Sequence, residues 1–160
     1  METFFGSLLT LLLLYKYVGL FLIAFVAAFA VPIPASTTLA AAGAFASQGY
    51  LSLGGVLLVA FLGNIAGDAA GFLIARFYGE KALHAIGLGR VLRSLPYRKV
   101  KKYIIEFPQS LIYFTRFLTQ FGPAVNILSG LSQVPYRTFF IFDFLGEASY
   151  VLLYGLTGFF

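Results

Sequence analysis

Charged side chains inside apolar stretches are the residues of this sequence most suited to chemistry. Asp68, Arg116 and Glu147 each stand in a long apolar segment, where a charge at the bilayer centre costs at least about 2.5–3.5 kcal/mol. The planar guanidinium matches a phosphate group. We therefore expect Arg116 to bind a phosphate or a lipid headgroup, and the alternative is a structural ion pair with Asp68, Asp143 or Glu147.

Asp68 and Glu147 each allow two interpretations. If they line a cavity, both are candidates for proton or ion coupling. A carboxylate at membrane depth is costly while it is charged, so it favours binding a proton or a cation. As structural groups, Asp68 would pair with a basic residue such as Arg76, and Glu147 with Arg116 or Arg137.

Short polar side chains near prolines and glycines are candidates for the rest of a phosphate site. Ser36, Thr37 and Asn126 occupy such positions, and exposed helix N-termini favour anions. Ser36 is expected to cap a short helix. For Asn126, the alternative is that it satisfies interrupted backbone. Asp143 lies near an expected helix start, where the helix dipole favours an acid.

Metal and cofactor chemistry is not expected. The sequence has no cysteine, one histidine (His84) and six acidic residues, so the usual ligand sets are missing. No close acid pair is apparent either. We expect no cofactor, no metal site and no catalytic residue, and we predict that the protein is not an enzyme.

Composition identifies an integral membrane protein. Of the 160 residues, 60% are hydrophobic and 11% are charged, against about 45–50% and about 25% in soluble domains. We expect a single all-α membrane domain spanning residues 1–160, with transmembrane helices and two opposed re-entrant hairpins related by an inverted repeat. The expected segments are a transmembrane helix at 4–31, a hairpin at 32–50, a transmembrane helix at 51–75, a basic cytoplasmic amphipathic segment at 76–106, a hairpin at 107–135 and a transmembrane helix at 137–160.

Prolines and glycines indicate where the two hairpins break. Irregular backbone at membrane depth is tolerated only inside protein or beside a watery cavity, and proline interrupts a helix. Hairpins inserted from opposite membrane faces would meet near the midplane. Similar runs, AGAFASQGYL…FLGNIAGD and LSGLSQVPYR…FLGEASY, support an internal repeat, and broken segments in corresponding halves often mark a transporter's site. The residues expected to shape the hairpins are Pro32, Pro34, Gly122, Pro123 and Gly130.

The segment between the two repeats, residues 76–102, indicates how the chain is oriented in the membrane. Residues 76–102 hold eight of the eleven basic residues, which places them on the cytoplasmic side. Val100, Ile104 and Phe107 have helical spacing, so we expect an amphipathic helix on the anionic leaflet rather than a nucleic-acid site.

Three glycines four residues apart predict close helix packing. Gly63, Gly67 and Gly71 give one helix face without side chains, which allows a neighbouring helix to approach closely.

These motifs resemble the DedA family, also called the SNARE-associated Golgi or VTT-domain family. The resemblance covers roughly residues 25–160 and rests on PIPASTTLAAAGAFASQGYL, LGNIAGDAAGFLIARFYGEK and FTRFLTQFGPAVNILSGLSQVPYRTFF. Ala35 and Ser36 stand where the family pattern has Gly-Glu, and only Arg116 of its arginine pair is present. The resemblance implies opposed re-entrant hairpins and movement of lipids or polyprenyl-phosphate carriers across membranes, often coupled to protons in bacteria.

The expected function is therefore movement of a lipid or polyprenyl-phosphate carrier, as a flippase or scramblase. Membrane lipids, anionic or phosphate-bearing, are the expected partners, and the prokaryotic cytoplasmic membrane is the expected location. A non-transporting structural or assembly protein is the first alternative, and an enzyme acting on lipid phosphates is the second.

Overall fold

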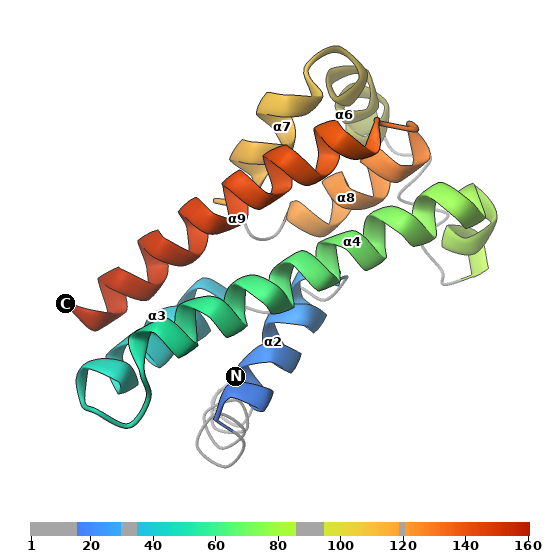
Figure 1. Cartoon of the computed structure of the whole chain (residues 1–160). Helices are drawn as coiled ribbons and strands as arrows, with labels where there is room; N and C mark the ends of the chain where they lie inside the picture. The colour runs from blue at the N-terminus through green and yellow to red at the C-terminus, as the bar shows by residue number, and fades with distance from the viewer. Residues whose placement is uncertain (1–15, 30–34, 86–94, 119–120) are drawn as a thin grey trace.

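The protein is built from helices wherever its structure is described. The computed structural model describes residues 16–29, 35–85, 95–118 and 121–160 (Figure 1). Within these ranges there is no strand, and the all-α prediction is confirmed. The helices are α2 (Tyr17–Phe29), α3 (Ala35–Ser47), α4 (Leu53–Ala85), α6 (Leu95–Glu106), α7 (Pro108–Thr115), α8 (Gly122–Leu131) and α9 (Tyr136–Phe159).

Among the described residues, two helices are long and apolar enough to cross a membrane. They are Leu53–Gly79 within α4, with 27 residues, and α9, with 24 residues; at 1.5 Å per residue they reach about 40 and about 36 Å, more than the hydrocarbon core of about 30 Å. We expected the first of these spans to end at residue 75. It continues to Gly79, whose positive φ of 62° kinks α4. Of the helix expected at 4–31, the structure describes only α2, which is shorter than a span.

Of the remaining helices, α2 and α3 form one pair that is consecutive in the sequence, and α7 and α8 form another. α3, α7 and α8 have 13, 8 and 10 residues, too few to cross a bilayer. Pro108 and Pro123 stand in the first turns of α7 and α8, where a missing N–H costs nothing. The proposed breaks at Pro32 and Pro34 lie outside the described residues, and the insertion of the hairpins from opposite membrane faces stays a prediction.

The two halves make the same helix pairings in opposite directions. α4 and α9 run antiparallel, α2 packs on α4, and α7 packs on α9 (Figure 1). The second helix of each pair crosses to the other half, since α3 packs on α9 and α8 packs on α4. Such exchanged pairing is expected of an inverted repeat.

Glycines at corresponding positions make these pairings close. A Cβ on Gly43 would lie 3.1 Å from the backbone nitrogen of Phe159, and one on Gly130 would lie 3.0 Å from that of Arg76. Gly130 therefore lies near the C-terminal end of α8 and packs against α4, and Gly122 is the first residue of α8. The role of both glycines in shaping a hairpin stays a prediction.

The glycine face of α4 is confirmed at two of three positions. A Cβ on Gly63 would lie 2.9 Å from the Cβ of Ala24, and one on Gly67 would lie 2.8 Å from that of Ala28, so α2 approaches both closely. At Gly71 the nearest atoms would be 3.6 Å away, an ordinary contact. Close packing therefore does not require a glycine at that position.

The expected amphipathic helix is present as α6. Ile104 is fully buried while Lys99 and Lys102 are exposed, so the apolar side faces the protein. Phe107 is 55% exposed and ends the helix, contrary to the expected apolar face. Residues 86–94 of the basic segment lie outside the described residues.

Two apolar clusters lie at opposite ends of the long helices. One joins α2, α3, α4 and α9 around Leu39 and Val56. The other joins α4, α6, α7, α8 and α9 around Phe72 and Phe139, whose rings stack at 4.0 Å. Between these clusters α4 and α9 carry four buried polar side chains, Asn64, Asp68, Asp143 and Glu147, and these belong to the candidate site.

Candidate functional site

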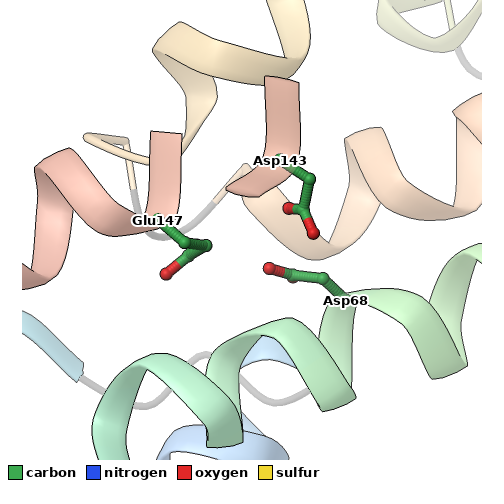
Figure 2. A group of neighbouring side chains, drawn as sticks. All are labelled: Asp68, Asp143 and Glu147. Carbon is green, nitrogen blue, oxygen red and sulfur yellow. The ribbon is translucent and has the colours of Figure 1, made fainter. Parts of the chain in front are cut away.

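Four buried charged side chains meet between the two halves. Asp68 projects from α4, Asp143 and Glu147 project from α9, and Arg116 stands at the C-terminal end of α7. Figure 2 shows the three carboxyl groups pointing toward one another, and their ligand oxygens lie within 4.8 Å of each other. We call these four residues the charged cluster.

Arg116 contacts all three acids of the charged cluster. Its Nη1 lies 2.9 Å from Oδ1 of Asp68 and 3.8 Å from Oε1 of Glu147, and its Nη2 lies 3.0 Å from Oδ1 of Asp143. No member is more than 5% exposed. Arg116 is therefore paired with acids, which is the structural alternative that the sequence allowed. It also lines a cavity.

Two amides extend the network. Arg116 Nη2 donates to Oδ1 of Asn126, and Nδ2 of Asn126 donates to Oδ1 of Asp68. Asn64 Nδ2 donates to Oε2 of Glu147 at 2.6 Å. Asn126 thus links α8 to α4, and Asn64 links α4 to α9.

Helical spacing and one glycine build this geometry. Asn64 and Asp68 are four residues apart on α4, and Asp143 and Glu147 are four apart on α9, so each pair shares a helix face. A Cβ on Gly146 would lie 2.7 Å from Cγ of Arg116. The bare backbone of Gly146 therefore makes room for the arginine stem between α7 and α9.

The cluster contains more acid than base. Three ionised carboxylates around one guanidinium would leave a formal charge of −2 in a buried site, and burying unbalanced charge is expensive. Within the described part of the chain, Asp68 Oδ2 and Asp143 Oδ2 make no hydrogen bond, whereas Asp143 Oδ1 is held in the ion pair with Arg116. The two Oδ2 atoms are therefore available to hold protons, and strongly interacting groups take up protons as a set.

The acid grouping corrects one expectation. We expected no close acid pair, yet α4 and α9 bring three carboxyl groups together. Carboxylate clusters can bind hard cations. Here the guanidinium, at 2.9 and 3.0 Å from two of the acids, already supplies the positive charge, so the geometry does not favour a metal ion.

A small cavity adjoins the charged cluster at the first residues of α3 and α8. It has a volume of about 30 Å³, room for about two water molecules. Its wall includes the first residues of α3 and α8, Ala35 and Gly122. Both helices begin at this cavity, and α8 has no side-chain cap. The polar residues of the wall are Asn64, Asp68, Thr115, Arg116, Glu147 and Tyr150.

The predicted site residues fall into two groups. Asp68, Arg116, Asn126 and Glu147 come together in one network, and Pro123 lines the cavity. Ser36 and Thr37 lie on the first turn of α3 but are absent from the cavity wall. Ser36 is the second residue of α3 as described, so it does not cap that helix from outside.

Sequence reasoning did not place two members of the network among the candidate site residues. Asp143 was expected near a helix start and named only as a possible structural partner of Arg116; it is the eighth residue of α9, fully buried and paired with Arg116. Asn64 was given no role, and its amide donates to Glu147. The i, i+4 spacing of Asp143 to Glu147 was the available signal.

This fold and site define a polytopic α-helical membrane protein in which two broken helix pairs enclose a buried charged cluster. The VTT-domain family model matches residues 33–160. The chain belongs to this family, the DedA family of membrane proteins.

Curated relatives support the membership. The chain is 30% identical over 122 residues to an uncharacterized membrane protein of Synechocystis, covering 74% of this chain and 54% of that protein. It is 27% identical over 133 residues to an uncharacterized membrane protein of Haemophilus influenzae, covering 81% and 63%. It is 26% identical over 130 residues to protein DedA of Escherichia coli, covering 80% and 59%. The chain thus spans between 54% and 63% of these relatives, and no solved structure matches it.

Proposed function

We propose that the protein moves a phosphate-bearing lipid, either a membrane lipid or a polyprenyl-phosphate carrier, across the prokaryotic cytoplasmic membrane. It would act as a flippase or scramblase. The observation that carries the proposal is the buried guanidinium of Arg116, which lies between two broken helix pairs beside a cavity. An arginine at that depth needs an anionic partner, and a lipid phosphate is one that can come and go.

The cavity wall supports an anion as the ligand. α3 and α8 both begin there, and helix N-termini present N–H groups and the positive end of the helix dipole. Arg116, Ala35 and Gly122 would therefore surround a phosphate with donors. The cavity of about 30 Å³ admits water only, so the helix pairs must part before a headgroup enters.

The acids supply a switch for this site. In the described conformation they occupy the guanidinium that the phosphate needs. Protons taken up by the acids would cancel their charge, weaken their hold and free Arg116 for the lipid. Release of the lipid would restore the ion pairs and return the protons. Asp68 and Glu147 are the proposed coupling groups, and Asp143 joins them.

A structural role is the second candidate, because one observation favours it. Both terminal nitrogens of Arg116 are engaged by acids and by Asn126, as they would be in a network that only fixes the two halves together. Under the transport proposal no bond of the lipid is broken, so the protein is not an enzyme.

Arg116→Lys tests the proposal. Lysine keeps the charge that three buried acids require, but it loses the fork that binds a phosphate at two points. The purified variant would be reconstituted into phosphatidylglycerol vesicles with a fluorescent phosphatidic acid, and lipid movement followed by dithionite quenching. Arg137→Ala is the matched control, because Arg137 is exposed and outside the cluster.

Transport that falls at least about tenfold in Arg116→Lys but not in Arg137→Ala is expected. Normal movement in Arg116→Lys and in Arg116→Ala, with both proteins folded, would refute the role of Arg116. A folded wild type that moves no lipid supports the structural candidate. Release of inorganic phosphate from phosphatidic acid would instead indicate an enzyme.

A further inference from the structure

We propose that Tyr150 contacts the transported lipid: its hydroxyl donates a hydrogen bond to an oxygen of the phosphate that Arg116 binds. The inference rests on the proposed function and adds a specificity-determining residue to the same site.

The hydroxyl of Tyr150 is buried without a partner. Tyr150 is 2% exposed, and its hydroxyl makes no hydrogen bond within the described part of the chain. A buried polar group left unpaired destabilises a fold, and nearly all such groups find a protein or water partner. A tyrosine at this position therefore indicates a partner outside the protein.

Packing alone explains the ring but not the hydroxyl. The ring belongs to the apolar cluster that includes Leu20, Leu39 and Val56, and it lies 4.9 Å from the ring of Tyr154. Phenylalanine would fill the same space and leave no unpaired oxygen. The hydroxyl is thus the feature of Tyr150 that requires a separate explanation.

The cavity beside the charged cluster supplies one. Tyr150 lines it together with Arg116 and Asn64. It lies one helical turn beyond Glu147 on α9, so both residues face the same side. The cavity has a volume of about 30 Å³, room for about two water molecules. When the helix pairs part, a phosphate enters this space.

A phosphate is the ligand chemistry that fits. The hydroxyl is a neutral donor, and a hydrogen bond to a charged acceptor is stronger than one to a neutral acceptor. Arg116, at the end of α7, contributes a positive charge and two directed N–H donors, whereas Tyr150 contributes a neutral O–H donor from α9. A lipid phosphate and a free phosphate share this chemistry, so both are used as probes.

The test compares Tyr150→Phe with Tyr154→Phe. Each variant loses one hydroxyl from α9, but Tyr154 is only half-buried and does not line the cavity. Dihexanoyl phosphatidic acid and inorganic phosphate would be titrated separately into detergent-solubilised protein by calorimetry. Movement of fluorescent phosphatidic acid would be measured in vesicles, and thermal unfolding in detergent.

For Tyr150→Phe we expect an unchanged or higher unfolding temperature and about tenfold weaker binding of phosphatidic acid, the loss typical of one hydrogen bond to a charged group. Tyr154→Phe should bind and transport as the wild type does. Weaker binding of inorganic phosphate alone, with normal lipid binding, overturns the inference in favour of a free-phosphate site.

Normal lipid binding and transport in Tyr150→Phe overturns the inference while leaving the role of Arg116 intact. An equal loss in both tyrosine variants, together with lower stability, also overturns it, because that pattern indicates packing. A wild type that neither binds nor moves phosphatidic acid refutes the proposed function itself.

Discussion

Close contact of α2 with α4 can be tested one glycine at a time. A Cβ on Gly67 would lie 2.8 Å from the Cβ of Ala28 and 3.1 Å from the backbone nitrogen of Phe29. One turn later, a Cβ on Gly71 would meet nothing closer than 3.6 Å. Gly67→Ala and Gly71→Ala are therefore the same change on the same helix, with and without space for the methyl group.

The two substitutions should change the free energy of unfolding in opposite directions. For Gly67→Ala, overpacking against the backbone of α2 destabilises the protein by about 3 kcal/mol, the upper end of the range for overpacked cores. The better helix propensity of alanine offsets about 1 kcal/mol of this loss. The net destabilisation of about 2 kcal/mol corresponds to an unfolding temperature about 4–8 °C lower. Gly71→Ala retains only the propensity gain of about 0.5–1 kcal/mol, or about 1–4 °C in the upward direction.

Thermal unfolding in one detergent, followed by circular dichroism, measures both variants against the wild type. Gly67→Leu should be worse than Gly67→Ala, because the larger side chain forces α2 further from α4. An unfolding temperature for Gly67→Ala equal to that of Gly71→Ala would refute the reasoning, since it would mean that α2 does not lie against this face.

Three further predictions concern the hydrogen bond from Asn64, the stacking of Arg76 on Tyr136 and the membrane topology. Asn64→Leu should lower stability by about 1–3 kcal/mol in thermal unfolding, because its buried carboxylate partner loses a 2.6 Å hydrogen bond; an unchanged midpoint would contradict that bond. Arg76→Lys should lower stability by about 1–2 kcal/mol, because lysine cannot reproduce the stacking of the guanidinium 4.1 Å from the ring centre of Tyr136; a lysine variant as stable as the wild type would show that the stacking contributes nothing. Single cysteines from Ser47→Cys and Lys102→Cys, both at exposed positions of a cysteine-free chain, should react with a membrane-impermeant maleimide from opposite sides, with Lys102→Cys on the cytoplasmic side, and labelling from one side would refute the two-sided arrangement.

The sequence by itself determined the class of protein and its helical segments. A chain with 60% hydrophobic residues and 11% charged residues must bury its surface in lipid or protein, so the membrane environment follows from composition. The long apolar runs become the spans within α4 and α9, because a helix satisfies its own backbone. The spacing of the glycines predicted close packing at Gly63 and Gly67, because a helix face without side chains can be recognised from the sequence of that helix alone.

Only the tertiary structure decided which polar residues meet. Asp68 and Arg116 are 48 positions apart, and their 2.9 Å contact depends on how α7 and α8 fold back against the long helices. Asp143 resembled a residue that stabilises a helix start, and only the packing of α7 against α9 makes it a partner of Arg116. Local spacing fixes which side chains share a helix face, whereas charge pairing between distant segments depends on packing that no local pattern encodes.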